Sequence, residues 1–196
     1  MMNRKYLVVL GLVLAGSAMA AEGISESSTY PGARSEDRNN TRPNIGIFVG
    51  AAAPSDNMDS AVNYGVDIGL TPAMPISLGI QASRFEVKND AALGNMKFSR
   101  IPLLGKVAYN VGGEVPVLRS MFLGAKAGVV FDKYEVNTAI GNASSDRTDF
   151  AIAPMAGFDI PIQKAWTAGV EGSYLFVQNN NDINNLDVHG AVKYWF

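Results

Sequence analysis

The sequence contains no cysteine and only one histidine, His189. The lack of cysteine excludes disulfides, thiol catalysis, thiolate metal sites and a lipid anchor attached to a cysteine. Neither sign of charge predominates, because the sequence has 16 basic and 18 acidic residues. The chain therefore has no basic footprint for a nucleic acid, and we expect no nucleic-acid partner, no metal site and no cofactor.

Beyond the first twenty residues, the chain lacks any apolar run that approaches the ~18 residues of a transmembrane helix. Hydrophobic residues nevertheless make up 47% of the sequence, and 20 glycines together with many asparagines favour strands and turns. A membrane role would therefore require alternating strands instead of helices.

The N-terminus has the pattern of a secretory signal peptide. Arg4 and Lys5 precede the apolar run 6–14, and a small-x-small cleavage pattern ends at Ala20. The run is shorter than the ~20 residues that span a membrane as a helix. We expect residues 1–20 to be removed on export.

Residues 21–43 combine serine, proline, glycine and mixed charge without periodicity. Such a composition does not bury enough apolar surface to order itself, so we expect a flexible periplasmic segment. A plug of the lumen or a partner-binding tail is the alternative.

From residue 44 onward, apolar residues alternate with polar or small ones in eight segments, which is the period of a β-strand. The segments cover residues 44–53, 61–70, 75–87, 97–109, 120–136, 148–160, 166–177 and 186–196. An even number of such segments, each about ten residues or longer, predicts an all-β fold, an eight-stranded antiparallel up-and-down transmembrane β-barrel spanning 44–196.

Pro102 and Pro154 lie inside two of these segments. Proline donates no hydrogen bond to the sheet, so we expect a bulge or a local break at each, and a bulge would exchange the two faces beyond it.

The connections between segments differ in length and polarity. With both barrel ends in the periplasm, the turns 71–74 and 161–165 and the longer connection 110–119 lie there. The polar loops 54–60, 88–96, 138–147 and 178–184 then face outside. The asparagine-rich stretch 179–185 lacks the spacing of a calcium loop, so we interpret it as a solvated external loop.

The parity of each segment assigns its side chains to the lipid or to the lumen. Aromatic residues expected at the membrane interfaces are Tyr109, Phe131, Phe150, Trp166, Tyr174 and Phe176, and residues expected to form a charge-paired lumen are Asp67, Arg100, Lys106, Lys126, Asp132, Glu171, Asp187, His189 and Lys193. Gln81 shares the inward face. An eight-stranded barrel is filled by such side chains, so we expect them to pair instead of lining an open pore.

The last segment ends its apolar face on Tyr194 and Phe196. In this it resembles the last strand of bacterial outer-membrane barrels, whose assembly machinery reads a C-terminal aromatic. Residues 44–196 as a whole resemble the small outer-membrane barrels typified by the opacity proteins and the membrane domain of OmpA. The resemblance implies a location in the cell outer membrane, with outer-membrane lipid, lipopolysaccharide and the barrel-assembly machinery as partners and Tyr194 and Phe196 as the assembly signal.

The leading functional hypothesis is a non-enzymatic outer-membrane barrel with a structural or surface-interaction role, whose surface ligand is unknown. The alternatives are a narrow pore for ions or small solutes, and a soluble periplasmic barrel that binds an apolar ligand and therefore has its faces inverted. Some eight-stranded barrels modify lipid A with a histidine, a serine and an acid. His189 is a lone histidine within reach of Glu171 and Ser173, and we interpret it as a structural partner, with no catalytic residue in the chain.

Overall fold

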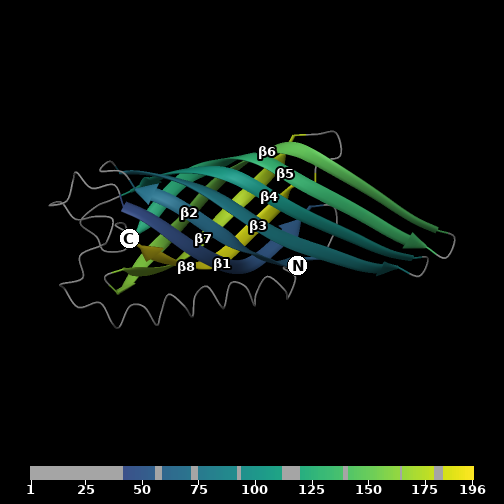
Figure 1. The fold of residues 1–196 in the computed structure, drawn as a ribbon, viewed down its shortest axis with the longest axis horizontal. Helices are drawn as coiled ribbons and strands as arrows, with labels where there is room; N and C mark the ends of the chain where they lie inside the picture. Colours follow the sequence, from purple (N-terminus) through teal and green to yellow (C-terminus); the bar gives the residue numbers. More distant parts are fainter. Residues whose placement is uncertain are drawn as a thin grey trace, which may run out of the picture.

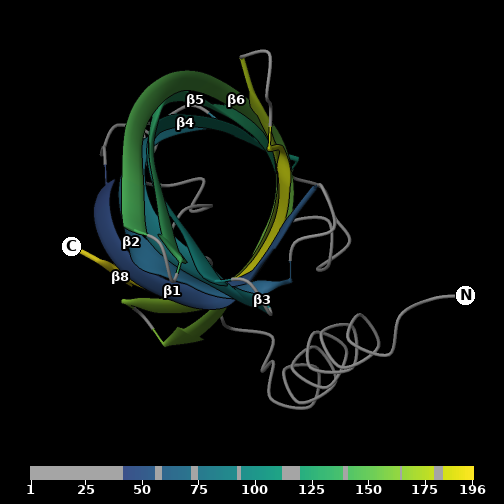
Figure 2. The ribbon, with the colours of Figure 1, turned by 90° about the vertical axis from the view of Figure 1, so that its right-hand side faces the viewer.

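The computed structural model describes residues 42–55, 59–71, 75–91, 94–111, 120–138, 141–163, 165–178 and 183–196. They form a closed barrel in which each strand pairs with its neighbour in sequence and β8 pairs with β1 (Figure 1). The strands are β1 (Arg42–Pro54), β2 (Ala61–Thr71), β3 (Ile76–Ala91), β4 (Gly94–Asn110), β5 (Met121–Thr138), β6 (Gly141–Gln163), β7 (Trp166–Val177) and β8 (Asn185–Trp195). The predicted eight-stranded antiparallel up-and-down barrel is confirmed, and Figure 2 shows its wall as a closed ring.

β1 begins two residues before the expected start of the barrel. β1 begins at Arg42, which lies opposite Thr71 of β2, and the carbonyl of Pro43 accepts a hydrogen bond of 3.1 Å from the amide of Phe196. These backbone pairs extend the strand into a stretch whose side chains carry no alternation. The expected signal peptide 1–20 and nearly all of the expected segment 21–43 lie outside the described residues.

Among the described residues, no helix is long and apolar enough to cross a membrane.

Four neighbouring strands are much longer than the other four. β3 to β6 have 16, 17, 18 and 23 residues, whereas β1, β2, β7 and β8 have 11 to 13. The long strands continue as a four-stranded sheet beyond one mouth of the barrel (Figure 1). We call this extension the tip sheet; it comprises residues 86–91, 94–99, 133–138 and 141–149. The opposite mouth, where Arg42 and Phe196 lie, is the terminus end.

The predicted loops 88–96 and 138–147 are therefore wrong. Ala91 pairs with Gly94 and Thr138 pairs with Gly141, so each is a tight hairpin of paired strands. The described side chains there, at 88, 95, 96 and 141–146, are exposed. Alternation arises only where one face is buried or meets lipid, so these segments carry none.

Both internal prolines interrupt the hydrogen-bonded ladder without changing its register. The β3–β4 pairing passes from Ala82–Leu103 to Phe85–Arg100 around Pro102, with the same offset on both sides. The β6–β7 pairing likewise passes from Ile152–Phe176 to Met155–Ser173 around Pro154. The expected local break is confirmed at each proline. The register shift lies instead between Pro161 and Gln163, at the terminus end of β6.

The wall is apolar outside and polar inside. Outward side chains such as Ile47, Val62, Ile80 and Val107 are exposed, whereas seventeen polar or charged residues are buried in the interior. Inward glycines leave room for this filling. An added Cβ on Gly50, for example, would collide with His189 on the neighbouring strand.

Candidate functional site

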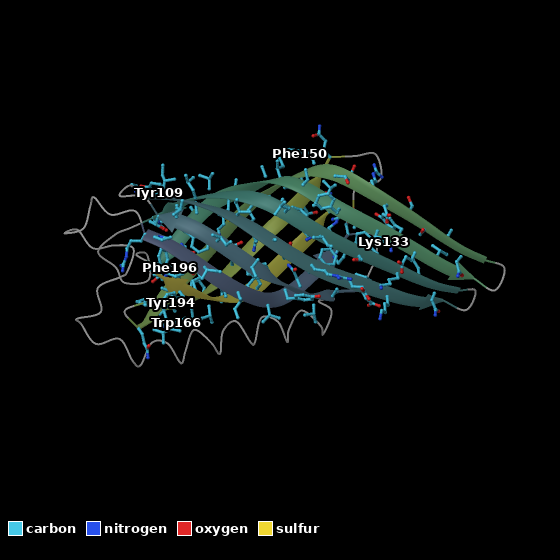
Figure 3. All side chains as sticks on the ribbon, in the orientation of Figure 1. Tyr109, Lys133, Phe150, Trp166, Tyr194 and Phe196 are labelled. Carbon is cyan, nitrogen blue, oxygen red and sulfur yellow. The ribbon has the colours of Figure 1, made fainter. Side chains whose placement is uncertain are left out.

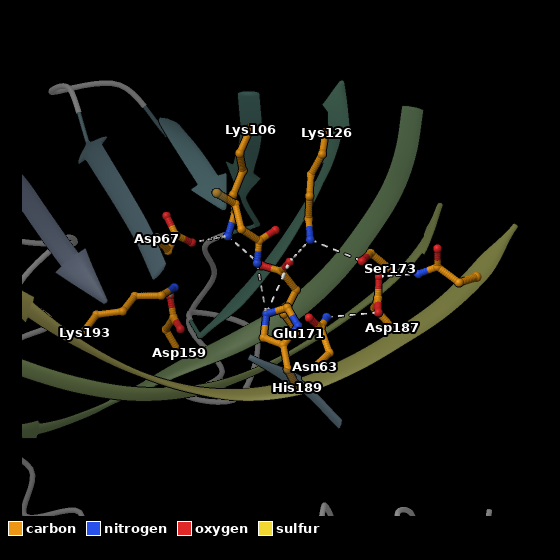
Figure 4. Close-up of polar contacts among 12 residues, drawn as sticks. Asn63, Asp67, Lys106, Lys126, Asp159, Glu171, Ser173, Asp187, His189 and Lys193 are labelled. Carbon is orange, nitrogen blue, oxygen red and sulfur yellow. Dashed lines mark hydrogen bonds and ion pairs between the residues drawn. The ribbon is translucent and has the colours of Figure 1, made fainter. Parts of the chain in front are cut away.

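The centre of the lumen is an ion-pair cluster around Glu171 of β7 (Figure 4). Its two carboxylate oxygens lie 2.5 Å from the ammonium groups of Lys106 and Lys126, and Lys106 also reaches Asp67 at 3.0 Å. Ser173 accepts a hydrogen bond of 3.2 Å from Lys126. All of these side chains are buried. Each charge therefore has an opposite charge within contact, as burial of ionised groups requires.

His189 borders this cluster without joining a catalytic arrangement. Its Nε2 lies 3.5 Å from the amide nitrogen of Gln81 and 3.7 Å from Glu171, and its ring stacks on Phe48 with centroids 4.3 Å apart. The hydroxyl of Ser173 is bound to Lys126 instead, and no hydrogen bond between the described residues joins it to His189. A nucleophile and its base must be within hydrogen-bond reach of each other, and these two groups are not joined in that way.

Asp187 of β8 occupies a separate polar site. It accepts hydrogen bonds from the amide groups of Asn63, at 3.1 Å, and Asn185, at 2.7 Å. No cationic side chain among the described residues forms an ion pair with Asp187. The two amide groups supply the hydrogen bonds that this buried carboxylate needs. Neither this site nor the Glu171 cluster suggests a metal centre, since no three acidic or histidine side chains converge in the described parts of the chain.

A cavity of about 100 Å³, lined by both polar and apolar side chains, opens at the terminus end and reaches inward to Lys106. Its wall includes Lys193, which pairs with Asp159 at 2.6 Å, and Thr167, which accepts a hydrogen bond from the indole of Trp195. The ammonium groups of Lys106 and Lys193 both lie over the ring of Phe122, at 5.2 and 5.4 Å. Asp67 and Lys106 of the Glu171 cluster line its inner part, and we call this cavity the vestibule.

An apolar layer lies beyond the Glu171 cluster toward the tip sheet. Its buried members are Leu104, Val130, Ala151, Ala153, Leu175 and Val177, from β4, β5, β6 and β7. Along β4, Leu104 stands between Lys106 and Arg100, and along β5, Val130 stands between Lys126 and Asp132. Apolar side chains offer no ligand to an ion.

Arg100 and Asp132 close the interior on the tip side of that layer. The guanidinium donates two hydrogen bonds to the carboxylate, of 2.7 and 2.6 Å. It also donates to the carbonyl of Ile183, at 2.6 Å, and to the side chain of Asn185, at 3.0 Å. We call residues 183–185 the latch segment. Asn184 secures it further, because its carbonyl accepts from the amide of Ser55 and its side chain accepts from the amide of Val177.

An aromatic cluster covers the latch. Ile183 is buried with Ala52, Phe85, Val87 and Phe98, and Tyr134 packs against the group. The rings of Phe98 and Tyr134 lie 4.9 Å apart, and Arg100 lies 5.2 Å from the centre of the Phe98 ring. The interpretation of 179–185 as a solvated loop is wrong for 183 and 185, which are buried; residues 179–182 lie outside the described structure. Buried side chains thus occupy the described interior at several levels along the barrel.

The outer face of the tip sheet carries a ladder of opposite charges. Glu86 of β3 lies within 3.5 Å of Arg84, Lys88 and Lys97, and Lys97 continues to Glu135, which pairs with Lys133 at 2.7 Å. The hydrogen bond from Lys133 holds the pKa of the Glu135 carboxyl below its usual value. Exposed ion pairs contribute little to the stability of a fold, so we interpret this charge ladder as a solvent-exposed surface.

The residues predicted for the lumen lie in the interior. Asp67, Arg100, Lys106, Lys126, Asp132, Glu171, Asp187, His189 and Lys193 are all buried, as is Gln81. The outward positions of Tyr109, Phe131, Phe150, Trp166, Tyr174 and Phe176 are exposed. In Figure 3, Tyr109, Trp166, Tyr194 and Phe196 gather at the terminus end, while Phe150 lies well along the barrel toward Lys133.

Sequence reasoning missed several interior partners. Asn63 and Asn185 are uncharged and are not among the residues predicted for the charge-paired lumen. Ile183 lies in a stretch without alternation. The inward parity of Asn63, between Val62 and Tyr64, was a signal that could have identified it. No signal in the sequence indicated that Ile183 folds into the mouth, since that contact joins it to strands about a hundred residues away.

No protein-family model matches this chain, and no curated protein matches its sequence. Solved structures do match its fold. The crystal structure of Neisserial surface protein A, NspA, is similar with a TM-score of 0.58 and 12% identity, over 80% of this chain and 97% of that one. The crystal structure of Ail, the attachment invasion locus protein of Yersinia pestis, is similar with a TM-score of 0.51 and 12% identity, over 80% and 97% of the two chains. At this identity the likeness shows the fold, which is that of the small bacterial outer-membrane barrels.

Proposed function

We propose that this protein is a non-enzymatic barrel of the bacterial outer membrane that displays the tip sheet at the cell surface. One observation carries the proposal: the barrel has an apolar exposed wall around a buried, charge-paired interior. A soluble barrel that binds an apolar ligand would have the opposite arrangement, with apolar side chains inside. An apolar outer wall is stable only where lipid covers it.

The terminus end faces the periplasm and the tip sheet faces outside in this proposal. Residues 1–20 act as the export signal, the barrel-assembly machinery recognises Tyr194 and Phe196, and the residues between the signal and β1 remain in the periplasm. Outer-membrane lipid and lipopolysaccharide surround the wall. The outward aromatics near each end of the wall would sit at the two interfaces, where aromatic rings are favoured.

The upper limit of the membrane falls between two successive outward positions of the same strand. On β5, the outward side chains pass from Phe131 to Lys133, and the charge ladder begins there. On β6, they pass from Phe150 to Thr148, one outward position lower, since Thr148 lies opposite Phe131. Charge is costly in the lipid-facing wall, which supports a boundary at this level.

A surface role is favoured over catalysis by the arrangement of the polar groups. The interior pairs are bonded to one another, and His189 has no bonded nucleophile. The solvent-exposed polar surface is concentrated instead in the tip sheet. The fold's resemblance to a protein named for the surface and to one named for attachment and invasion supports the same reading.

A narrow pore is the second candidate, and the vestibule is the observation that favours it. An ion entering from the terminus end could reach Lys106. It would then have to cross the Glu171 cluster, the apolar layer and the latch. We therefore expect no conductance steps from the purified protein in planar bilayers, and regular steps would establish the pore in place of the closed barrel.

Single cysteines test the placement directly, because the chain has none of its own. Ser144→Cys places a thiol on the exposed tip sheet, and Ser77→Cys places one in the wall of the vestibule. A membrane-impermeant maleimide should label the first variant on intact cells, and the second only after the outer membrane is opened. Labelling of Ser77→Cys on intact cells, or none at Ser144→Cys, would overturn the proposed orientation.

A further inference from the structure

The tip sheet ends in an open strand edge on β6. From Gly141 to Phe150 this strand pairs with β5, but its pairing with β7 begins only at Ala151, opposite Val177. Among the described residues, no strand therefore pairs with the second edge of 142–148. The side chains from Asn142 to Asp146 are exposed.

The hydrogen bonds lower on β6 show which backbone groups face that open edge. The carbonyl of Phe150 accepts from Gln178 beside β7, whereas the amide of Asp159 donates to Ser120 beside β5. In an antiparallel strand, the amide and carbonyl of one residue point to the same side, and successive residues alternate. Even-numbered residues of β6 therefore point to the open edge. These are Asn142, Ser144, Asp146 and Thr148.

The other edge of the tip sheet, on β3, is protected differently. Beyond Phe85, which pairs with Asn63, β3 has no described partner on its β2 side. Its side chains there include Glu86 and Lys88, which belong to the charge ladder. Charged side chains oppose edge-to-edge pairing. Between residues 142 and 148 the β6 edge carries one acidic and one basic side chain, Asp146 and Arg147, among small side chains. The β6 edge is therefore the more open of the two to another strand.

We propose that the β6 edge binds the same edge of a second copy of this chain, as an antiparallel strand pair centred on Ser145. In this register, the edge-facing residues meet as Asn142 with Thr148 and Ser144 with Asp146 of the partner copy. Each pair is hydrogen-bonding and none opposes like charges. Arg147 lies opposite Ala143 of the partner copy, on the other face.

The direction of the strands determines where the second copy must be. Two barrels standing in one membrane have their β6 strands running the same way, so their edges can meet only as parallel strands. An antiparallel pair requires one barrel to be inverted relative to the other. That arrangement exists when two cells face each other across their outer membranes, so the contact joins neighbouring cells.

This inference rests on the proposed function, because it requires the tip sheet to lie outside the cell. A single short strand pair is weak, but many copies on two facing surfaces act together and convert weak contacts into lasting adhesion.

Disulfide trapping between two cell populations tests the register. Opposed residues in a non-hydrogen-bonded antiparallel pair have Cα atoms about 4.5 Å apart, within the range that a disulfide spans. Two differently tagged populations carrying Ser145→Cys should therefore form a mixed-tag dimer under mild oxidation. Thr148→Cys cells mixed with Asn142→Cys cells should do the same, whereas either of these variants alone should not cross-link to itself.

Labelling of Ser145→Cys by an impermeant maleimide on intact cells separates the possible failures. Efficient labelling without a mixed-tag dimer would overturn the self-pairing and leave the proposed function in place. Absence of labelling would overturn the proposed placement itself. Self-cross-linking of Thr148→Cys would show a different pairing and contradict the register centred on Ser145.

A backbone variant tests the edge itself. Ser144→Pro, added to Ser145→Cys, removes an amide that faces the open edge and none that faces β5. We expect the mixed-tag dimer to be lost, while Ser144→Thr, which keeps both the backbone amide and the hydroxyl, retains it. Heat-dependent gel mobility identical to that of the parent would show that the proline variant still folds, and an undiminished dimer in that folded variant would refute the proposal.

Discussion

Arg100 of β4 and Asp132 of β5 lie directly opposite each other and share two hydrogen bonds, of 2.7 and 2.6 Å, in a fully buried site. The same guanidinium binds the latch segment through Ile183 and Asn185. One side chain therefore joins the wall of the barrel to the segment that closes its mouth.

Replacing Arg100 by methionine should destabilise the barrel strongly. Asp132 would be left as an uncompensated buried charge, which costs about 3–5 kcal/mol. Urea unfolding of the protein in detergent or lipid measures the loss. The matched control is Arg147→Met, since Arg147 is partly exposed and its pair with Asp149 is expected to contribute about 0–1 kcal/mol. Combining Arg100→Met with Asp132→Leu should recover most of the stability, and equal losses from Arg100→Met and Arg147→Met would contradict this assignment.

Replacing Pro154 by alanine should strengthen the wall between β6 and β7. Residue 154 has the parity that points to β7, so the new amide can complete the interrupted ladder. One added hydrogen bond contributes about 0.5–1.5 kcal/mol. Hydrogen exchange at residue 154 and urea unfolding measure the gain. Pro161→Ala is the control, because Pro161 lies next to a register shift at the strand end and should give no comparable gain.

Lowering the pH should disrupt the ion pairs of the charge ladder before it affects the barrel. The pKa of Glu135 is lowered by its hydrogen bond from Lys133. Its contribution is therefore complete above the ordinary glutamate pKa and is lost as the pH falls through the lowered value. NMR titration of the Glu135 side chain follows this transition. Lys133→Met should return the pKa of Glu135 toward its ordinary value, and an unchanged titration in that variant would show that Lys133 is not the cause.

Releasing the latch should open the tip-side mouth without unfolding the wall. Ile183→Asp places a carboxylate among the apolar side chains of Phe85, Phe98 and their neighbours, where burial of a charge is costly. We expect faster hydrogen exchange at residues 183–185 and unchanged exchange at the β1–β8 seam. Asn184→Asp keeps an acceptor for the amide of Val177 and serves as the control. Equal protection of the segment in both variants would argue against a latch held by Ile183.

The sequence predicted the transmembrane part of the strands well because lipid imposes a strict rule on it. Val62, Tyr64 and Val66 must face outward while Asn63 and Asp67 face inward, so alternation is continuous there. The inward charges could be identified by parity alone. Their particular partners could not, because Lys106 and Glu171 come from strands that only the closed ring brings together.

The tip sheet could not be predicted in this way, because neither lipid nor the core imposes a pattern on it. Residues such as Asn142, Ser144 and Thr148 are held in a strand by backbone pairing with β5, and their exposed side chains need no pattern. The latch escaped as well, because the burial of Ile183 depends on Phe85 and Phe98 from distant strands. Local sequence carries information where a face is committed to lipid or to the core, and little where water covers both faces.

The mobility of the unheated and heated protein from isolated outer membranes on a denaturing gel tests the central claim most directly. A closed transmembrane barrel resists detergent until it is heated, so we predict that the protein is found in this fraction and runs faster without heating. Recovery in the soluble fraction, with the same mobility before and after heating, would contradict a membrane barrel.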